Sequence, residues 1–149
     1  MIIIKNGALV TPQGLRRADL AMEGDKIVRI AAAIEPGEGD TVQDATDCWV
    51  FPGFIDGHTH MQCWTGMDWT ADSFETGTRA AACGGTTTIL DHMAFGPAGC
   101  SLRYPFERYR KLAVPCPVDY SFHGVIQHVD DADHALIACI PEFHQTGVD

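Results

Sequence analysis

The chain has 149 residues, a formal net charge of −10 at pH 7, 46% hydrophobic residues and 20% charged residues. An acidic balance argues against a nucleic-acid partner, because phosphate binding needs basic patches. The composition predicts a folded globular chain rather than a disordered one. No run approaches the ~18 apolar residues of a membrane helix, and the N-terminus lacks the basic and apolar regions of a signal peptide. We therefore expect no membrane partner.

The cysteines are spaced widely, with no Cys-x-x-Cys pair, at positions 48, 63, 83, 100, 116 and 139. This spacing is neither that of a zinc finger nor that of a compact disulfide framework. Free thiols in a reducing compartment account for the pattern. We therefore predict a cytoplasmic protein.

Short apolar runs separated by glycine-rich turns fill residues 1–52. Asn6-Gly7 and Gly24-Asp25 are turn signals, and residues 35–40 form an acidic loop. Such spacing is typical of a small antiparallel sandwich. Expected strands are 1–5, 8–10, 18–22, 26–30 and 48–51. Residues 1–52 are therefore predicted to form part of a β-sandwich.

From Gly53 onward the pattern changes to alternating strands and helices, which predicts parallel βα units and an α/β fold. Expected strands are 54–60, 86–91 and 118–126. The first helix is predicted to start at Asp72, with Glu75 as its capping-box partner, and to stop at Gly84. Further helices are expected over 103–113 and after Asp130 or Asp131.

His58-Thr59-His60 ends the first of these expected strands. Residues at i and i+2 on a strand share a face, about 6–7 Å apart. Zinc binds imidazole nitrogen at about 2.0–2.1 Å, so one ion could take both rings. Strict alternation also places Phe54 and Asp56 on this face, where Asp56 would be a buried carboxylate in need of a partner. The alternative is a pair of exposed histidines without a metal.

The residues around this pair extend the pattern. Residues 52–60, Pro-Gly-Phe-Ile-Asp-Gly-His-Thr-His, resemble the signature of the amidohydrolase superfamily. Residues 74–92 resemble its dihydropyrimidinase and hydantoinase branch, and residues 96–100 and 119–128 resemble bacterial D-phenylhydantoinases. This resemblance covers essentially the whole chain.

The resemblance implies a TIM-like (β/α)8 metal-dependent hydrolase barrel, of which residues 53–149 hold the first three βα units. Such a barrel needs about 250 residues. We therefore expect the N-terminal part of a longer enzyme, or a truncated product, that is inactive alone. The resemblance also implies that strands from the far C-terminus complete the sandwich. The catalytic residues are expected beyond Asp149.

The implied activity is hydrolysis of a carbon–nitrogen bond, which opens the cyclic amide ring of hydantoins or dihydropyrimidines to N-carbamoyl amino acids. By resemblance, His58 and His60 bind one of two zinc ions. A carboxylated lysine that bridges the ions lies outside this chain. The resemblance further implies a small-molecule substrate and a homotetramer.

Other residues are candidates around this site. Trp64, Met67 and Trp69 lie in the loop after the histidine strand, where barrel enzymes shape their pockets; the alternative is that the two tryptophans pack against helices or another subunit. Asp56 is a candidate partner that would orient the metal ligands through hydrogen bonds. Asp91 and His92, at the end of the next strand, are further candidates for this role.

Two further functions remain open from the sequence. One is another amidohydrolase, such as an allantoinase, a dihydroorotase or a deaminase. The other is a non-catalytic dihydropyrimidinase-related protein that has lost metal ligands. Intact His58 and His60 argue against the second.

Overall fold

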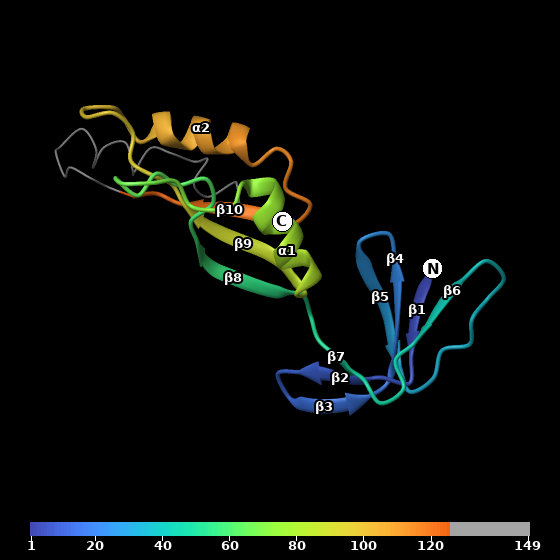
Figure 1. Cartoon of the computed structure of the whole chain (residues 1–149). Helices are drawn as coiled ribbons and strands as arrows, with labels where there is room; N and C mark the ends of the chain where they lie inside the picture. Colours follow the sequence, from blue (N-terminus) through green and yellow to red (C-terminus); the bar gives the residue numbers. More distant parts are fainter. Residues whose placement is uncertain (126–149) are drawn as a thin grey trace. The chain divides into compact units, whose positions relative to one another are not determined.

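The computed structural model describes residues 1–125, and the chain divides into two compact units, Met1–Pro52 and Gly53–Asp149. Each unit has its own β-sheets (Figure 1). Within the described residues, no helix is long and apolar enough to span a membrane. The helix expected after Asp130 or Asp131 lies outside the described residues.

The first unit contains two sheets. The four-stranded sheet has the order β5-β4-β1-β6, and the three-stranded sheet has the order β3-β2-β7. The strands are β1 (Ile2–Lys5), β2 (Ala8–Thr11), β3 (Gly14–Arg17), β4 (Asp19–Glu23), β5 (Lys26–Ala31), β6 (Thr41–Asp44) and β7 (Trp49–Val50). β1 pairs with β4, β2 with β3 and β4 with β5 in antiparallel fashion, whereas β1–β6 and β2–β7 are parallel, so the predicted antiparallel arrangement holds only in part. β3 and β6 were not predicted, because all their residues are exposed and carry no apolar alternation.

A buried carboxylate ties the first unit together. The Oδ1 and Oδ2 atoms of Asp19 accept the backbone N–H groups of Asn6 and Ile34, each at 2.9 Å. The Lys5 ammonium lies 3.5 Å from Oδ2. The pKa of Asp19 is lowered most by the hydrogen bond from the N–H of Asn6, and next by that from the N–H of Ile34. The Lys5 charge lowers it further, while burial opposes these effects. Asn6, in the left-handed region at φ 67°, turns the chain from β1 to β2 in the other sheet.

The second unit is a parallel sheet of order β10-β9-β8, with β8 (Phe54–Thr59), β9 (Thr86–His92) and β10 (Asp119–His123). The helices α1 (Phe74–Cys83) and α2 (Arg103–Leu112) connect successive strands. Phe74 from α1 and Tyr109 from α2 share one core with Ile89 and Phe122 of the sheet. Both helices therefore cover the same face, as expected for βα units.

The start of α1 differs from its prediction by one residue. Ser73 is the N-cap: its hydroxyl accepts the N–H of Thr76 at 3.1 Å, and the Thr76 hydroxyl accepts the N–H of Ser73 at 3.0 Å. Asp72 instead accepts the Thr76 hydroxyl, and Glu75 pairs with Arg79. The prediction of an Asp72–Glu75 box is wrong, because a hydroxyl at Thr76 can close the box as well as a carboxylate can.

Gly53, directly before β8, lies very close to the Thr87 side chain of β9. A Cβ at Gly53 would lie 2.1 Å from the Thr87 Oγ1, so only glycine fits there. Register shifts interrupt the β8–β9 ladder between Phe54 and Ile55 and between Asp56 and Thr59. Strict alternation therefore does not extend along β8.

Candidate metal centre

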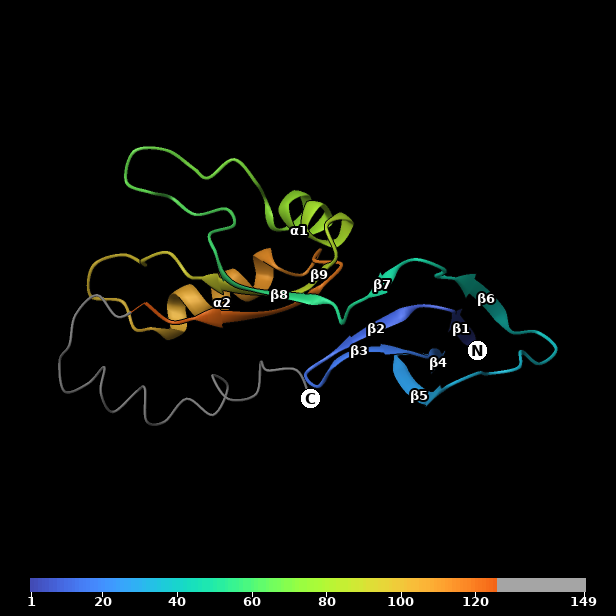
Figure 2. The same cartoon turned by 90° about the horizontal axis from the view of Figure 1, so that it is seen from below.

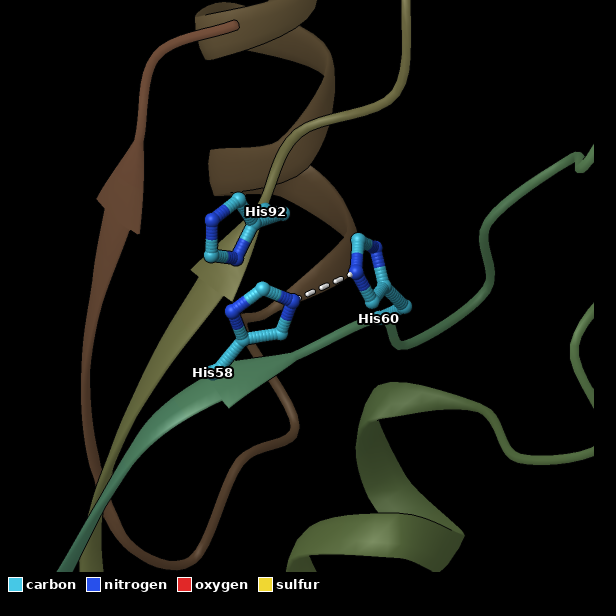
Figure 3. Close-up of side chains that lie close together, drawn as sticks. All are labelled: His58, His60 and His92. Atoms are coloured by element: carbon cyan, nitrogen blue, oxygen red, sulfur yellow. Dashed lines mark hydrogen bonds between the residues drawn. The ribbon is translucent and has the colours of Figure 1, made fainter.

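Two imidazoles meet at the end of β8. His58 is in the strand and His60 follows its last residue, and their Nε2 atoms lie 3.0 Å apart (Figure 3). Both side chains are exposed. Converging ring nitrogens on exposed side chains are the donor set that zinc prefers, and an ion with bonds of about 2.1 Å can contact both atoms at once. The geometry of the pair therefore fits a metal ion.

His92, at the end of β9, joins this pair. One ring nitrogen from each of His58, His60 and His92 lies within 4.8 Å of the other two. The Nδ1 atom of His92 is buried and has no hydrogen-bond partner among the described residues. Burial lowers the pKa of His92, and the nearby imidazoles of His58, His123 and His60 lower it further. A neutral imidazole is the form that binds a metal.

His123 extends the row of rings onto β10. Its ring centroid lies 4.6 Å from that of His92. Its Nε2 atom, however, lies 3.2 Å from the Gly57 carbonyl oxygen, which occupies that nitrogen. Among the described residues, the histidines close enough to share a metal ion are His58, His60 and His92. The sequence predicted His92 only as a residue that supports the ligands.

Two carboxylates hold the backbone on either side of the histidines. Asp56 Oδ1 accepts the N–H of His58 at 3.1 Å, but Asp56 is exposed, so the prediction that it is buried is wrong. That prediction placed Asp56 on a face inside a closed barrel, whereas every residue from Phe54 to His58 is exposed in the part of the chain that the structure describes. Asp91 is fully buried, and its Oδ1 accepts the Thr59 hydroxyl at 2.7 Å and the Met61 N–H at 2.8 Å. Its bonds go to the chain beside His60 rather than to an imidazole.

Burial raises the pKa of the Asp91 carboxyl. The N–H of Met61, the hydroxyl of Thr59 and the charge of His60 oppose that effect without cancelling it.

The connection between β8 and α1 forms a long open loop (Figure 2). Trp64 and Trp69 face each other across an isolated β-bridge, with ring centroids 5.6 Å apart, and the Arg108 guanidinium lies 5.9 Å from the Trp69 ring centroid. Both tryptophans line a hollow of about 1140 Å³ that also reaches His60 and His92.

Met67 is 89% exposed and is not among the residues that line this hollow. Arg108 and Tyr109 of α2 line it, as does Phe95, although the sequence had not predicted them there. No local motif marks Arg108 and Tyr109, since they reach the hollow only when α2 packs on the sheet, and Phe95 lies in the segment that follows β9.

The sequence profile of the Amidohydrolase family matches residues 49–146. The D-phenylhydantoinase of Escherichia coli O9:H4 (strain HS) is 47% identical over 148 residues, which are 99% of this chain and 32% of the relative. The chain therefore spans about a third of the length of the curated relatives it matches.

Solved structures agree with the sequence comparison. A crystal structure of a D-hydantoinase superposes with a TM-score of 0.87 at 39% identity, covering 94% of this chain and 30% of that one. The dihydropyrimidinase of Brevibacillus agri NCHU1002 gives a TM-score of 0.85 at 34% identity, covering 91% and 29%. This likeness confirms the predicted fold class, the first βα units of a TIM-like barrel with sheets before them. The chain belongs to the amidohydrolase family, as the motif from Pro52 to His60 predicted.

Proposed function

We propose that this chain supplies the first metal ligands of a cyclic amidase, which opens hydantoin or dihydropyrimidine rings to N-carbamoyl amino acids. The observation that carries the proposal is the 3.0 Å approach of the His58 and His60 Nε2 atoms. It occurs in a chain that is 47% identical to a D-phenylhydantoinase over its matched length.

Zinc is the proposed metal, held by His58 and His60, because neutral imidazoles suit it. When bound, it supplies a Lewis acid for the ring carbonyl and makes water reactive near neutral pH. Catalytic zinc usually has three protein ligands, so two histidines need a further donor. In the complete protein, a carboxylated lysine outside this chain would supply such a donor. Among the described residues, His92 has a ring nitrogen close to those of His58 and His60.

The remaining residues of the site bind and orient. Asp56 holds the backbone at His58, and Asp91 holds the chain at Thr59 and Met61. Trp64 and Trp69 offer flat apolar walls for the exocyclic group of a substrate, which suits an aryl substituent. Met67, exposed at the tip of the loop, would contact substrate only if the loop closed over it.

We also propose a role for the first unit, an assembly and a cellular compartment. The first unit, Met1–Pro52, is proposed to be part of a composite β-sandwich that strands from another part of the protein complete. The assembly is proposed to be a homotetramer in the cytoplasm. Sedimentation of the purified protein tests the assembly.

Zinc content and ring hydrolysis of the purified full-length protein, which includes the catalytic residues expected outside this chain, test the function. The wild type should bind zinc and convert phenylhydantoin or dihydrouracil to its N-carbamoyl product. His58→Ala and His60→Ala should lose both properties. His123→Gln is the matched control, because glutamine can keep the bond to the Gly57 carbonyl, and it should retain zinc.

Each contrary result has a distinct meaning. Zinc binding that survives the loss of both His58 and His60 would refute the proposed site. Hydrolysis of allantoin or dihydroorotate instead would identify another amidohydrolase. Zinc binding without any hydrolysis would identify a non-catalytic relative.

A further inference from the structure

Asp91 is a carboxylate with no exposed surface at the boundary between the sheet and the helices. Its Oδ1 atom accepts two hydrogen bonds, from the Thr59 hydroxyl and the Met61 N–H. Its Oδ2 atom is buried without a hydrogen-bond partner among the described residues. Burying a carboxylate costs free energy that an apolar side chain would not cost. A core requirement alone therefore does not explain an aspartate at this position.

The two donors to Asp91 flank a metal-ligand candidate. Thr59 and Met61 are the residues immediately before and after His60. Thr59 is the last residue of β8, and the β8–β9 register shifts between Asp56 and Thr59. The ladder resumes at Thr59, which pairs with Asp91, and the Asp91 side chain adds its own bonds where the ligand segment begins.

Packing fixes the same segment from the helix side. A Cβ at Gly77 of α1 would lie 2.4 Å from the Met61 Sδ, so the Met61 side chain rests directly on the helix. Asp91 holds the backbone N–H of Met61 while α1 holds its side chain. His60 is thus the one residue of the triplet Thr59-His60-Met61 whose side chain is exposed.

We propose that Asp91 is a positioning residue that sets the His60 imidazole against that of His58 and thereby raises the affinity of the site for zinc. The inference rests on the proposed metal function and deepens it. Two ligands bind one ion tightly only if they converge beforehand, and partners that orient a ligand typically change metal affinity by about 10- to 100-fold.

The exposed Asp56 contrasts with Asp91. Among the residues that the structure describes, Asp56 bonds the His58 N–H, within its own strand and at the surface. Asp91 reaches across from β9 and joins the ligand segment to the core that both helices share. Only the second arrangement transmits the rigidity of the core to a ligand.

Zinc affinity of the purified full-length protein, measured by competition with a chelator, tests this role. Asp91→Ala should weaken zinc binding about 10-fold or more. Thr59→Val, which removes one donor at nearly constant shape, should weaken it measurably, and Thr59→Ser should restore it. These shifts should appear in the affinity of the folded protein, not only in its melting temperature.

Thr78→Val is the matched control. Thr78 is also fully buried in the second unit, and its hydroxyl donates to the Phe74 carbonyl of α1 instead. This variant should lower thermal stability without changing zinc affinity. If Asp91→Ala does not fold, the Thr59→Val and Thr59→Ser pair decides the question.

The outcomes separate the two proposals. Zinc binding by the wild type that is unchanged in Asp91→Ala and Thr59→Val would overturn the positioning role while leaving the metal site intact. Equal losses of affinity in Thr78→Val and Thr59→Val would also overturn it, since general core loosening would then explain both. A wild type that binds no zinc would instead refute the proposed function itself.

Discussion

The Nε2 atoms of His58 and His60 lie 3.0 Å apart at the end of a strand whose pairing shifts register between Asp56 and Thr59. A continuous strand would set the two side chains about 6–7 Å apart at their bases. The rings nevertheless converge, because both lean toward the His92 side of the sheet (Figure 3). Because of this convergence, one metal ion can contact both imidazoles.

Zinc should stabilise the protein through these histidines. A ligand present at a hundred times its dissociation constant adds about 2.7 kcal/mol to the free energy of unfolding. We expect a chelator to lower the melting temperature of the wild type, and zinc to restore it. The double variant His58→Ala/His60→Ala should show no such shift, and an equal shift in that variant would place the zinc elsewhere.

Gly53→Ala should destabilise the second unit. Its Cβ would lie 2.1 Å from the Oγ1 and 2.7 Å from the Cβ of Thr87, a stiff β-branched side chain in β9. Overpacking of this kind costs about 1–3 kcal/mol. Urea denaturation measures the change. Gly57→Ala in the same strand is the control, because no atom lies within 4 Å of its Cβ position, and a similar loss there would rule out the clash.

Ser73→Ala should destabilise α1, since it removes the hydroxyl that accepts the Thr76 N–H. Loss of such a cap costs about 0.5–2 kcal/mol. Glu75→Gln is the control: the exposed Glu75–Arg79 pair at 2.9 Å should contribute only about 0.3–0.5 kcal/mol. Thermal unfolding should rank the two changes in that order. The reverse order would show that Ser73 does not cap the helix.

Asp19 should make the stability of the first unit depend on pH. Its pKa is lowered in the folded protein, so the carboxylate stabilises the fold fully above the unfolded pKa of about 3.9 and progressively less as the pH falls through the lowered value. Asp19→Asn should flatten this acid dependence and destabilise the fold by about 1–3 kcal/mol at neutral pH. Denaturant titrations at several pH values measure both effects. Identical acid profiles for the two proteins would contradict this origin of the dependence.

The periodicity of the sequence predicted the second unit well and the first unit less well. Strands at 86–91 and a helix at 103–113 agree closely with β9 and α2, because their buried residues alternate or recur regularly. β3 and β6 escaped prediction because they are short and exposed, and a strand without a buried face leaves no pattern. The five cysteines within the described residues are free, as predicted.

The sequence by itself determined the histidine pair, through its spacing, and the family of this chain, through the motif from Pro52 to His60. His58 and His60 are two residues apart, so short-range geometry alone brings them to one site. Only the tertiary structure decided that His92 joins them and that Asp91 bonds the chain on both sides of His60. These contacts join residues about thirty positions apart, and they depend on the register in which β8 and β9 pair. Register is specified by which face of each strand is buried, and burial depends on the whole folded unit rather than on a short stretch of sequence.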